Sequence, residues 1–185
     1  MQIRTITTIL VFVCLLSGGS GCGSSPSTTA PDPTAFGQKY KIADNQIPGW
    51  TQDLGPDTYW TGTDLVAAGI DGGNVAYDDR GFRQGMFQTL DGPVPQICNL
   101  RAMDFGTESN ATTMFQYAQK TNSATVSIPP FDASTAAGET VLGGADAFAH
   151  FNASYFELYL TGYADPNAAI SDATLFLQVL QSDAK

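Results

Sequence analysis

Apolar and polar residues alternate along two neighbouring stretches of the chain, and a helical pattern follows them. Residues 82–90 and 97–105 have the alternation typical of strands, and the glycine and two prolines of 91–95 predict the turn of a hairpin. Apolar residues three and four positions apart then predict a helix over 108–120, which Thr107 is suited to cap. These apolar positions are Ala111, Met114, Phe115 and Ala118.

The same order of elements recurs in the last third of the chain. Residues 145–151 and 154–161 are predicted strands joined by a tight turn at Asn152-Ala153. A first-turn proline follows at 166, and apolar residues at helical spacing predict a helix over 167–181. Two strand-strand-helix units of this kind predict an α+β fold, with an antiparallel sheet and helices packed on one face.

The remaining segments carry weaker patterns. Residues 124–128 are a predicted strand that two prolines end, and 140–142 are a second short strand after a Gly/Ala-rich loop over 132–138. Residues 47–50 and 58–60 predict short extended pieces. A short helix is expected to follow over 63–70 and to end in a glycine turn at 71–74.

The N-terminus has the pattern of an export signal. A single Arg4 precedes the apolar run 6–16, which falls short of the roughly 20 residues that a membrane span needs. The run ends in small residues before Cys22 and resembles the bacterial lipoprotein box, with Gly19 where that box usually has Leu. The resemblance implies a signal peptide over 1–21 and lipidation of Cys22; the alternative is ordinary cleavage after Gly21.

A segment of Gly, Ser, Thr, Ala and Pro follows this cysteine. Such a composition cannot bury a core, so we expect a flexible tether over 22–36 and a single α+β domain over 37–185. Several acyl chains on Cys22 would anchor the protein stably to a membrane. No Asp directly follows Cys22, and the lipoprotein resemblance therefore implies the outer membrane of a bacterial cell envelope.

A second resemblance concerns the glycine segment. The chain resembles a family of uncharacterised bacterial envelope proteins in which a short helix leads to Ile-Asn-Gly-Gly, a Tyr, and Gly-Phe at the start of a strand. The matching residues are Leu65, Ile70, Asp71, Gly72, Gly73, Tyr77, Gly81 and Phe82. Asp71 stands where the family usually has Asn. The resemblance implies the architecture and no activity.

Charge and residue counts exclude several functions. The formal net charge is −10, so binding to a phosphate backbone, and hence to nucleic acid, is not expected. Cys98 is the only cysteine beyond the signal and anchor region, so the domain forms no internal disulfide, and we expect a buried, inert thiol. His150 is the only histidine, no Gly-x-Ser-x-Gly occurs in the mature chain, and the place of His150 on a predicted strand favours a structural role, so a serine-hydrolase triad is not expected. One histidine and one thiol also fall short of a four-ligand zinc site.

Two groups of side chains remain as candidate sites. Calcium takes several oxygen ligands from one loop, and the oxygen-bearing residues of the glycine segment are Asp71, Asn74, Asp78 and Asp79. Their spacing does not match a calcium loop, and turn and capping roles explain them without a metal. No other cofactor is expected.

The second group lies on the last predicted strand. Tyr155, Tyr159 and Tyr163 share one side of it with Glu157. If this face is exposed, Tyr155, Glu157 and Tyr159 form a binding surface for a glycan or a partner protein. If another layer covers it, the tyrosines belong to the core, which we consider the better interpretation.

The leading hypothesis is a membrane-anchored envelope lipoprotein with a non-enzymatic binding domain. One alternative is an envelope hydrolase that uses two Asp/Glu carboxylates facing one cleft, one of them with a pKa raised by burial. The other is a structural spacer module.

Overall fold

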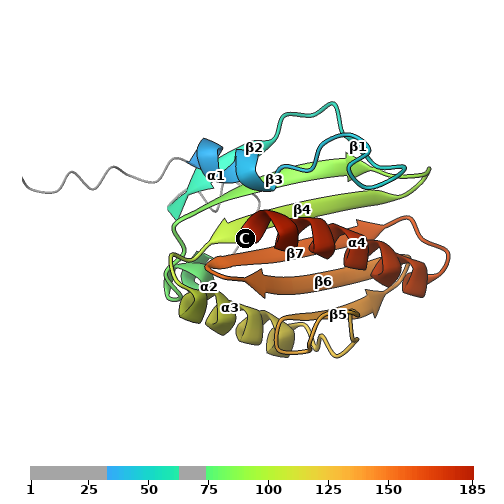
Figure 1. The fold of residues 1–185 in the computed structure, drawn as a ribbon. Coiled ribbons are helices and arrows are strands. Elements are labelled where there is room, and N and C mark those ends of the chain that lie inside the picture. The colour runs from blue at the N-terminus through green and yellow to red at the C-terminus, as the bar shows by residue number, and fades with distance from the viewer. Residues whose placement is uncertain (1–32, 63–73) are drawn as a thin grey trace, which may run out of the picture. The chain divides into compact units, whose positions relative to one another are not determined.

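The computed structural model describes residues 33–62 and 74–185, which form an antiparallel sheet flanked by helices (Figure 1). Within these residues the sheet has seven strands in the order β1-β3-β4-β7-β6-β5, and β2 pairs with β3 beside β1. The strands are β1 Thr51–Gln52, β2 Thr58–Thr61, β3 Gln84–Asp91, β4 Ile97–Asp104, β5 Ala136–Val141, β6 Gly144–Phe151 and β7 Ser154–Thr161. The helices are α1 Pro33–Tyr40, α2 Asn74–Asp78, α3 Glu108–Thr121 and α4 Pro166–Ala184. The predicted α+β class and antiparallel sheet are confirmed.

The two predicted strand-strand-helix units are present as β3-β4-α3 and β6-β7-α4, with β4 and β7 paired at the middle of the sheet. The first helix begins at Glu108 as predicted, and the second begins at Pro166, one residue before its predicted start. The Thr107 side chain accepts a hydrogen bond from the Asn110 amide at 3.2 Å, and Asp165 accepts one from the Asn167 amide at 2.9 Å. Local sequence therefore determines where both helices begin.

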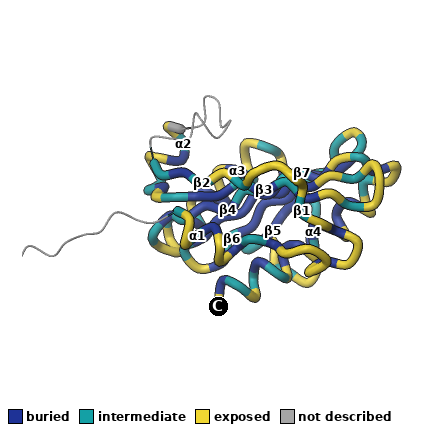
Figure 2. The backbone as a smooth tube through the Cα atoms, turned by 90° about the horizontal axis from the view of Figure 1, so that it is seen from above, coloured by how far each residue is buried: buried dark blue, intermediate teal, exposed yellow. Residues whose placement is uncertain are grey.

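The prediction that the helices pack on one face is wrong. The side chains of α1 and α4 join one apolar cluster with β4 and β7 residues such as Leu100 and Leu158. Those of α3 join a second cluster with Met103 and Tyr155, which point to the opposite face of the same strands. Helix α3 contacts β6 and β7, as α4 does, but from the opposite side of the sheet. The middle strands are consequently buried along most of their length (Figure 2).

Three boundaries also differ from the sequence predictions. The folded part includes α1 from Pro33, so it begins inside the range assigned to the tether. Strand β5 begins at Ala136, inside the predicted loop 132–138, because Ala136 and Ala137 are buried against the sheet. The predicted strand 124–128 contributes a single bridge between Val126 and Gly138. The predicted helix 63–70 lies outside the described residues.

Helix α1 sits directly on β2 and β3. A Cβ at Gly37 would overlap the Tyr59 ring, so glycine at this position allows the helix to approach the strand. Tyr40 packs against Phe156 on the sheet with ring centroids 5.1 Å apart. Its hydroxyl is hydrogen-bonded to the Ser154 hydroxyl at 2.9 Å.

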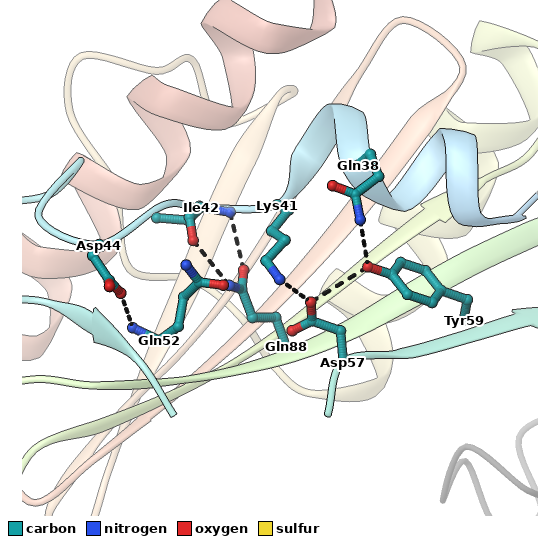
Figure 3. A network of polar contacts seen from close by, with 8 residues as sticks. All are labelled: Gln38, Lys41, Ile42, Asp44, Gln52, Asp57, Tyr59 and Gln88. Atoms are coloured by element: carbon teal, nitrogen blue, oxygen red, sulfur yellow. Dashed lines mark hydrogen bonds and ion pairs between the residues drawn. The ribbon is translucent and has the colours of Figure 1, made fainter. Parts of the chain in front are cut away.

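Polar contacts fasten the chain that follows α1 (Figure 3). The buried Gln88 side chain accepts a hydrogen bond from the Ile42 amide at 3.0 Å and donates one to the Ile42 carbonyl at 2.9 Å. Lys41 forms an ion pair with Asp57, whose carboxylate also accepts a bond from the Tyr59 hydroxyl at 3.3 Å. The segment 33–42 is thus an integral part of the domain.

Candidate functional site

The candidate site is built around Glu157, near the middle of β7. Its cross-strand partners are Arg101 on β4 and Phe148 on β6, so its side chain points to the α3 face of the sheet. Glu157 is only 2% exposed. A carboxylate this deeply buried requires compensating hydrogen bonds or charge.

Four donors supply that compensation. The hydroxyls of Tyr77 and Tyr155 donate to Glu157 Oε1 at 2.7 and 3.2 Å. The Tyr159 hydroxyl and Arg101 Nη1 donate to Oε2 at 2.9 and 3.2 Å. Each carboxylate oxygen accepts two hydrogen bonds, which uses the accepting capacity of the group. Glu157 is therefore suited to hold its neighbours in position and not to transfer a proton.

The three tyrosines remain donors across the physiological pH range. Burial, followed by the negative charge of Glu157, raises the pKa of Tyr77, Tyr155 and Tyr159 well above the ordinary tyrosine value. Arg101 also lies against the Tyr159 ring, with its guanidinium carbon 5.2 Å from the ring centroid. The Glu157 cluster, defined as Tyr77, Arg101, Tyr155, Glu157 and Tyr159, therefore fixes the orientation of Tyr159 and Arg101.

A line of polar side chains crosses the sheet next to this cluster. The cross-strand pairs of β3, β4, β7, β6 and β5 align them on the α3 face, and each is partly exposed. We call them the polar row: Thr89, Asn99, Tyr159, Asp146 and Glu139. Tyr159 belongs to both groups, so the buried cluster anchors the centre of the row.

Asp146 is the most perturbed carboxyl group of the row. Burial, then the charges of Glu139 and Glu157, raise its pKa from 3.8 to about 6. Glu139 is its direct cross-strand partner on β5. The two carboxyl groups thus lie side by side on one surface, with like charges that repel at neutral pH.

The sequence candidates on β7 divide into two layers. Tyr155 is fully buried and Glu157 nearly so, which favours the core interpretation for both, whereas Tyr159 is partly exposed. Tyr163 does not share their face. It lies beyond the end of β7 and donates to Asp172 Oδ2 on α4 at 2.7 Å.

Of the calcium candidates, only Asp78 and Asp79 have side chains that the structure describes. Asp78 and Asp79 are exposed at the end of α2, and Asp71 and the predicted lipidation site Cys22 lie outside the described residues. Among residues 33–62 and 74–185, no group of three or more His, Cys, Asp or Glu side chains could hold a metal ion. Calcium binding through Asp71, Asn74, Asp78 and Asp79 stays a prediction.

The single histidine has structural partners. His150 Nε2 lies 2.9 Å from the Ser134 carbonyl oxygen, which can only accept, so Nε2 carries the proton of this bond. Its Nδ1 lies 3.4 Å from the Thr112 hydroxyl, and Phe115 packs against the ring. These contacts fit the structural role expected for His150. Cys98 is fully buried on the α4 face, where burial raises the pKa of its thiol far above the ordinary range.

Sequence reasoning missed the partners of Glu157 and the polar row. Arg101 alternates with Asn99 on the predicted strand 97–105, so both were recognisable as one face of β4. Nothing in the sequence places that face beside Glu157, because the β4–β7 pairing joins segments more than fifty residues apart. Tyr77 is further still, at a separation of eighty residues.

Comparisons with known proteins give little further information. No family model and no curated protein matches the chain, so the two family resemblances stay predictions. One similar solved structure is the extracellular domain of PknH from Mycobacterium tuberculosis, at 14% identity and a TM-score of 0.43, with 83% of this chain and 92% of that chain covered. A likeness of this size is no guide to what this chain does. Along the described residues, no helix is sufficiently long and apolar to cross a membrane.

Proposed function

We propose that this chain is an envelope lipoprotein, anchored through Cys22, whose domain is a non-enzymatic binding module that uses the polar row. The main support for this binding surface is that the partly exposed polar row lies beside a buried carboxylate, Glu157. The side chains of the row are partly exposed, and its central residue Tyr159 is held by a buried carboxylate with four donors. Such support lowers the entropy lost when a ligand binds.

The described geometry favours binding over hydrolysis. Asp146 has the raised pKa that an acid catalyst needs, and Glu139 lies beside it. A glycosidase, however, places its two carboxyl groups on opposite sides of a sugar, about 5 to 9.5 Å apart. Glu139 and Asp146 are directly paired strand positions, so their side chains leave the same face of the sheet side by side and do not enclose a sugar from two sides. A surface pair of this kind suits contact with a ligand better than cleavage of one.

The membrane anchor is tested by replacing Cys22 with Ser. Acyl chains on this residue would place the exported protein in the detergent phase of a phase separation. We expect Cys22→Ser to move it into the aqueous phase, with Cys98→Ser as the matched control that leaves partitioning unchanged. Equal partitioning of wild type and Cys22→Ser would refute lipidation at this residue.

The binding surface is tested by photo-crosslinking in cells. A photoreactive residue at Asn99 samples the polar row, and the same residue at the exposed Ser171 of α4 samples the far face. We expect an adduct of discrete mass from position 99 and none from position 171. No adduct from either position, or the same adduct from both, would contradict a binding role for the row.

A further inference from the structure

The charge of the polar row identifies the chemistry of its ligand. Glu139 and Asp146 place two carboxyl groups next to each other, and neither takes part in the ion pairs found among the described residues. The nearby cation is Arg101, whose charge is already engaged by Glu157 at 3.2 Å. At neutral pH the exposed part of the row is therefore negative, as is the chain as a whole.

Aromatic stacking contributes little on this surface. Tyr159 is the single ring of the row, and Arg101 already covers part of it. Its neighbours on the same face, Phe148 and Tyr155, are 1% and 0% exposed. A glycan platform relies on exposed rings, whereas a carboxylate pair attracts ammonium and guanidinium groups. The row thus favours a cationic ligand over a neutral sugar.

The length of the row indicates the size of that ligand. It crosses five strands that lie about 4.8 Å apart, which gives a span of about 19 Å. An extended peptide covers about 3.3 Å per residue, so a segment of about six residues would match the row from Thr89 to Glu139.

We propose that the polar row binds a short basic segment of a partner protein, with a Lys or Arg side chain seated between Glu139 and Asp146. This inference rests on the proposed function and adds the class of ligand. Asn99 and Tyr159 contact the polar backbone of the segment, and the net negative charge of the domain accelerates encounter with it.

The charged groups that face Asp146 determine how this binding depends on pH. They are Glu139 from β5, Glu157 and Tyr159 from β7, and Arg101 from β4. The pKa of Asp146 is about 6, so its carboxyl group is mostly charged at pH 7.5 and mostly neutral at pH 5. The basic segment is expected to bind more weakly at the lower pH.

The probe is a labelled hexapeptide of alternating Lys and Thr with blocked ends, titrated into the exported chain in detergent and followed by fluorescence anisotropy. The Glu139→Gln/Asp146→Asn double variant is expected to bind about tenfold more weakly at low salt, because two charge contacts are lost. The control is Asp78→Asn/Asp79→Asn, which removes the same two charges from an exposed site and is expected to change affinity less than twofold.

Three outcomes overturn the basic-segment proposal: equal binding of a peptide with Gln in place of Lys, an equal loss in the control variant, or no binding of the lysine peptide. Preferential binding of a neutral oligosaccharide would also overturn it in favour of a glycan ligand. Each of these results leaves the crosslinking test of the row unaffected. If the row crosslinks in cells but its binding does not depend on charge, only the ligand class is refuted. If the row never crosslinks, the binding function itself is refuted.

Discussion

The two faces of the central strands are built for different purposes. On the α4 face, residues such as Leu100, Leu158 and Phe176 are fully buried in one apolar cluster. On the opposite face α3 covers only part of the sheet, and the same strands there carry the Glu157 cluster and the polar row. Adjacent residues of β7 therefore belong to different environments, since successive strand residues point to opposite faces.

This difference separates stability from recognition. Apolar burial on the α4 face is non-directional and tolerates little loss of volume. On the α3 face, burial of the Glu157 carboxylate costs desolvation free energy. Its hydrogen bonds offset this cost only while all their partners are in place. Its benefit is orientation, because Tyr159 and Arg101 are each held by a specific bond to Glu157.

The largest effect is expected on the apolar face. Phe176 of α4 is fully buried and packs edge-on against Trp50, with ring centroids 4.9 Å apart. Phe176→Ala should lower the free energy of unfolding by about 3–5 kcal/mol through lost burial and the cavity left behind. The measurement is urea unfolding of Phe176→Ala and, as the control, of Leu175→Ala. The wild-type Leu175 side chain is 43% exposed. Equal losses at positions 175 and 176 would contradict the assigned face of α4.

A smaller effect is expected from the carboxylate on the other face. Glu157→Gln keeps the shape of the side chain but removes the charge opposite Arg101 and replaces one acceptor oxygen by a donor. We expect a loss of about 2–3 kcal/mol in the free energy of unfolding, because the half-buried Arg101 is left without its counter-charge. The same replacement at the partly exposed Glu139 should cost no stability, because it removes a charge that repels Asp146.

The two variants also differ in what they do to binding. Phe176→Ala should leave the affinity of the folded protein for its ligand unchanged, whereas Glu157→Gln should weaken it by releasing Tyr159. A Glu157→Gln protein as stable as the wild type would show that the negative charge of this side chain contributes no net stability.

The comparison of faces also explains what the sequence could predict. Strand β7 and the start of α3 were predicted to the residue because alternation, a tight turn and a cap are local signals. Helix α1 was missed because the residues that hold it, such as Gly37 and Tyr40, matter through contacts with distant strands. The side of the sheet that α3 occupies is likewise a tertiary choice, since its apolar stripe would fit either face.

The candidate site was predictable in part for the same reason. The sequence placed Glu157 on the tyrosine-bearing face of β7, and the structure confirms that Tyr155 and Tyr159 are its neighbours. It could not supply Arg101 or Asp146, because the pairing of β7 with β4 and β6 decides which side chains stand beside Glu157. Alternation identifies a face, and only the strand order assembles a site on it.

The smallest effect, and the one that separates the row from the layer beneath it, is expected at Asp146. Its pKa in the folded chain, about 6, lies above the ordinary 3.8, so the folded state holds the proton more tightly than the unfolded chain. The stability linked to this proton is complete below about pH 4 and is lost as the pH rises through 6.

At pH 7.5 the charged Asp146 therefore destabilises the fold, and Asp146→Asn should raise the free energy of unfolding by about 1 kcal/mol once solvent screening of a partly exposed group is allowed for. At pH 3.5 variant and wild type should be nearly equal, whereas Asp78→Asn at the exposed end of α2 should show no such pH dependence. A stability difference for Asp146→Asn that is the same at both pH values would mean that Glu139 and Glu157 do not act on this carboxyl group, and the row would lose the charge pair on which its proposed ligand depends.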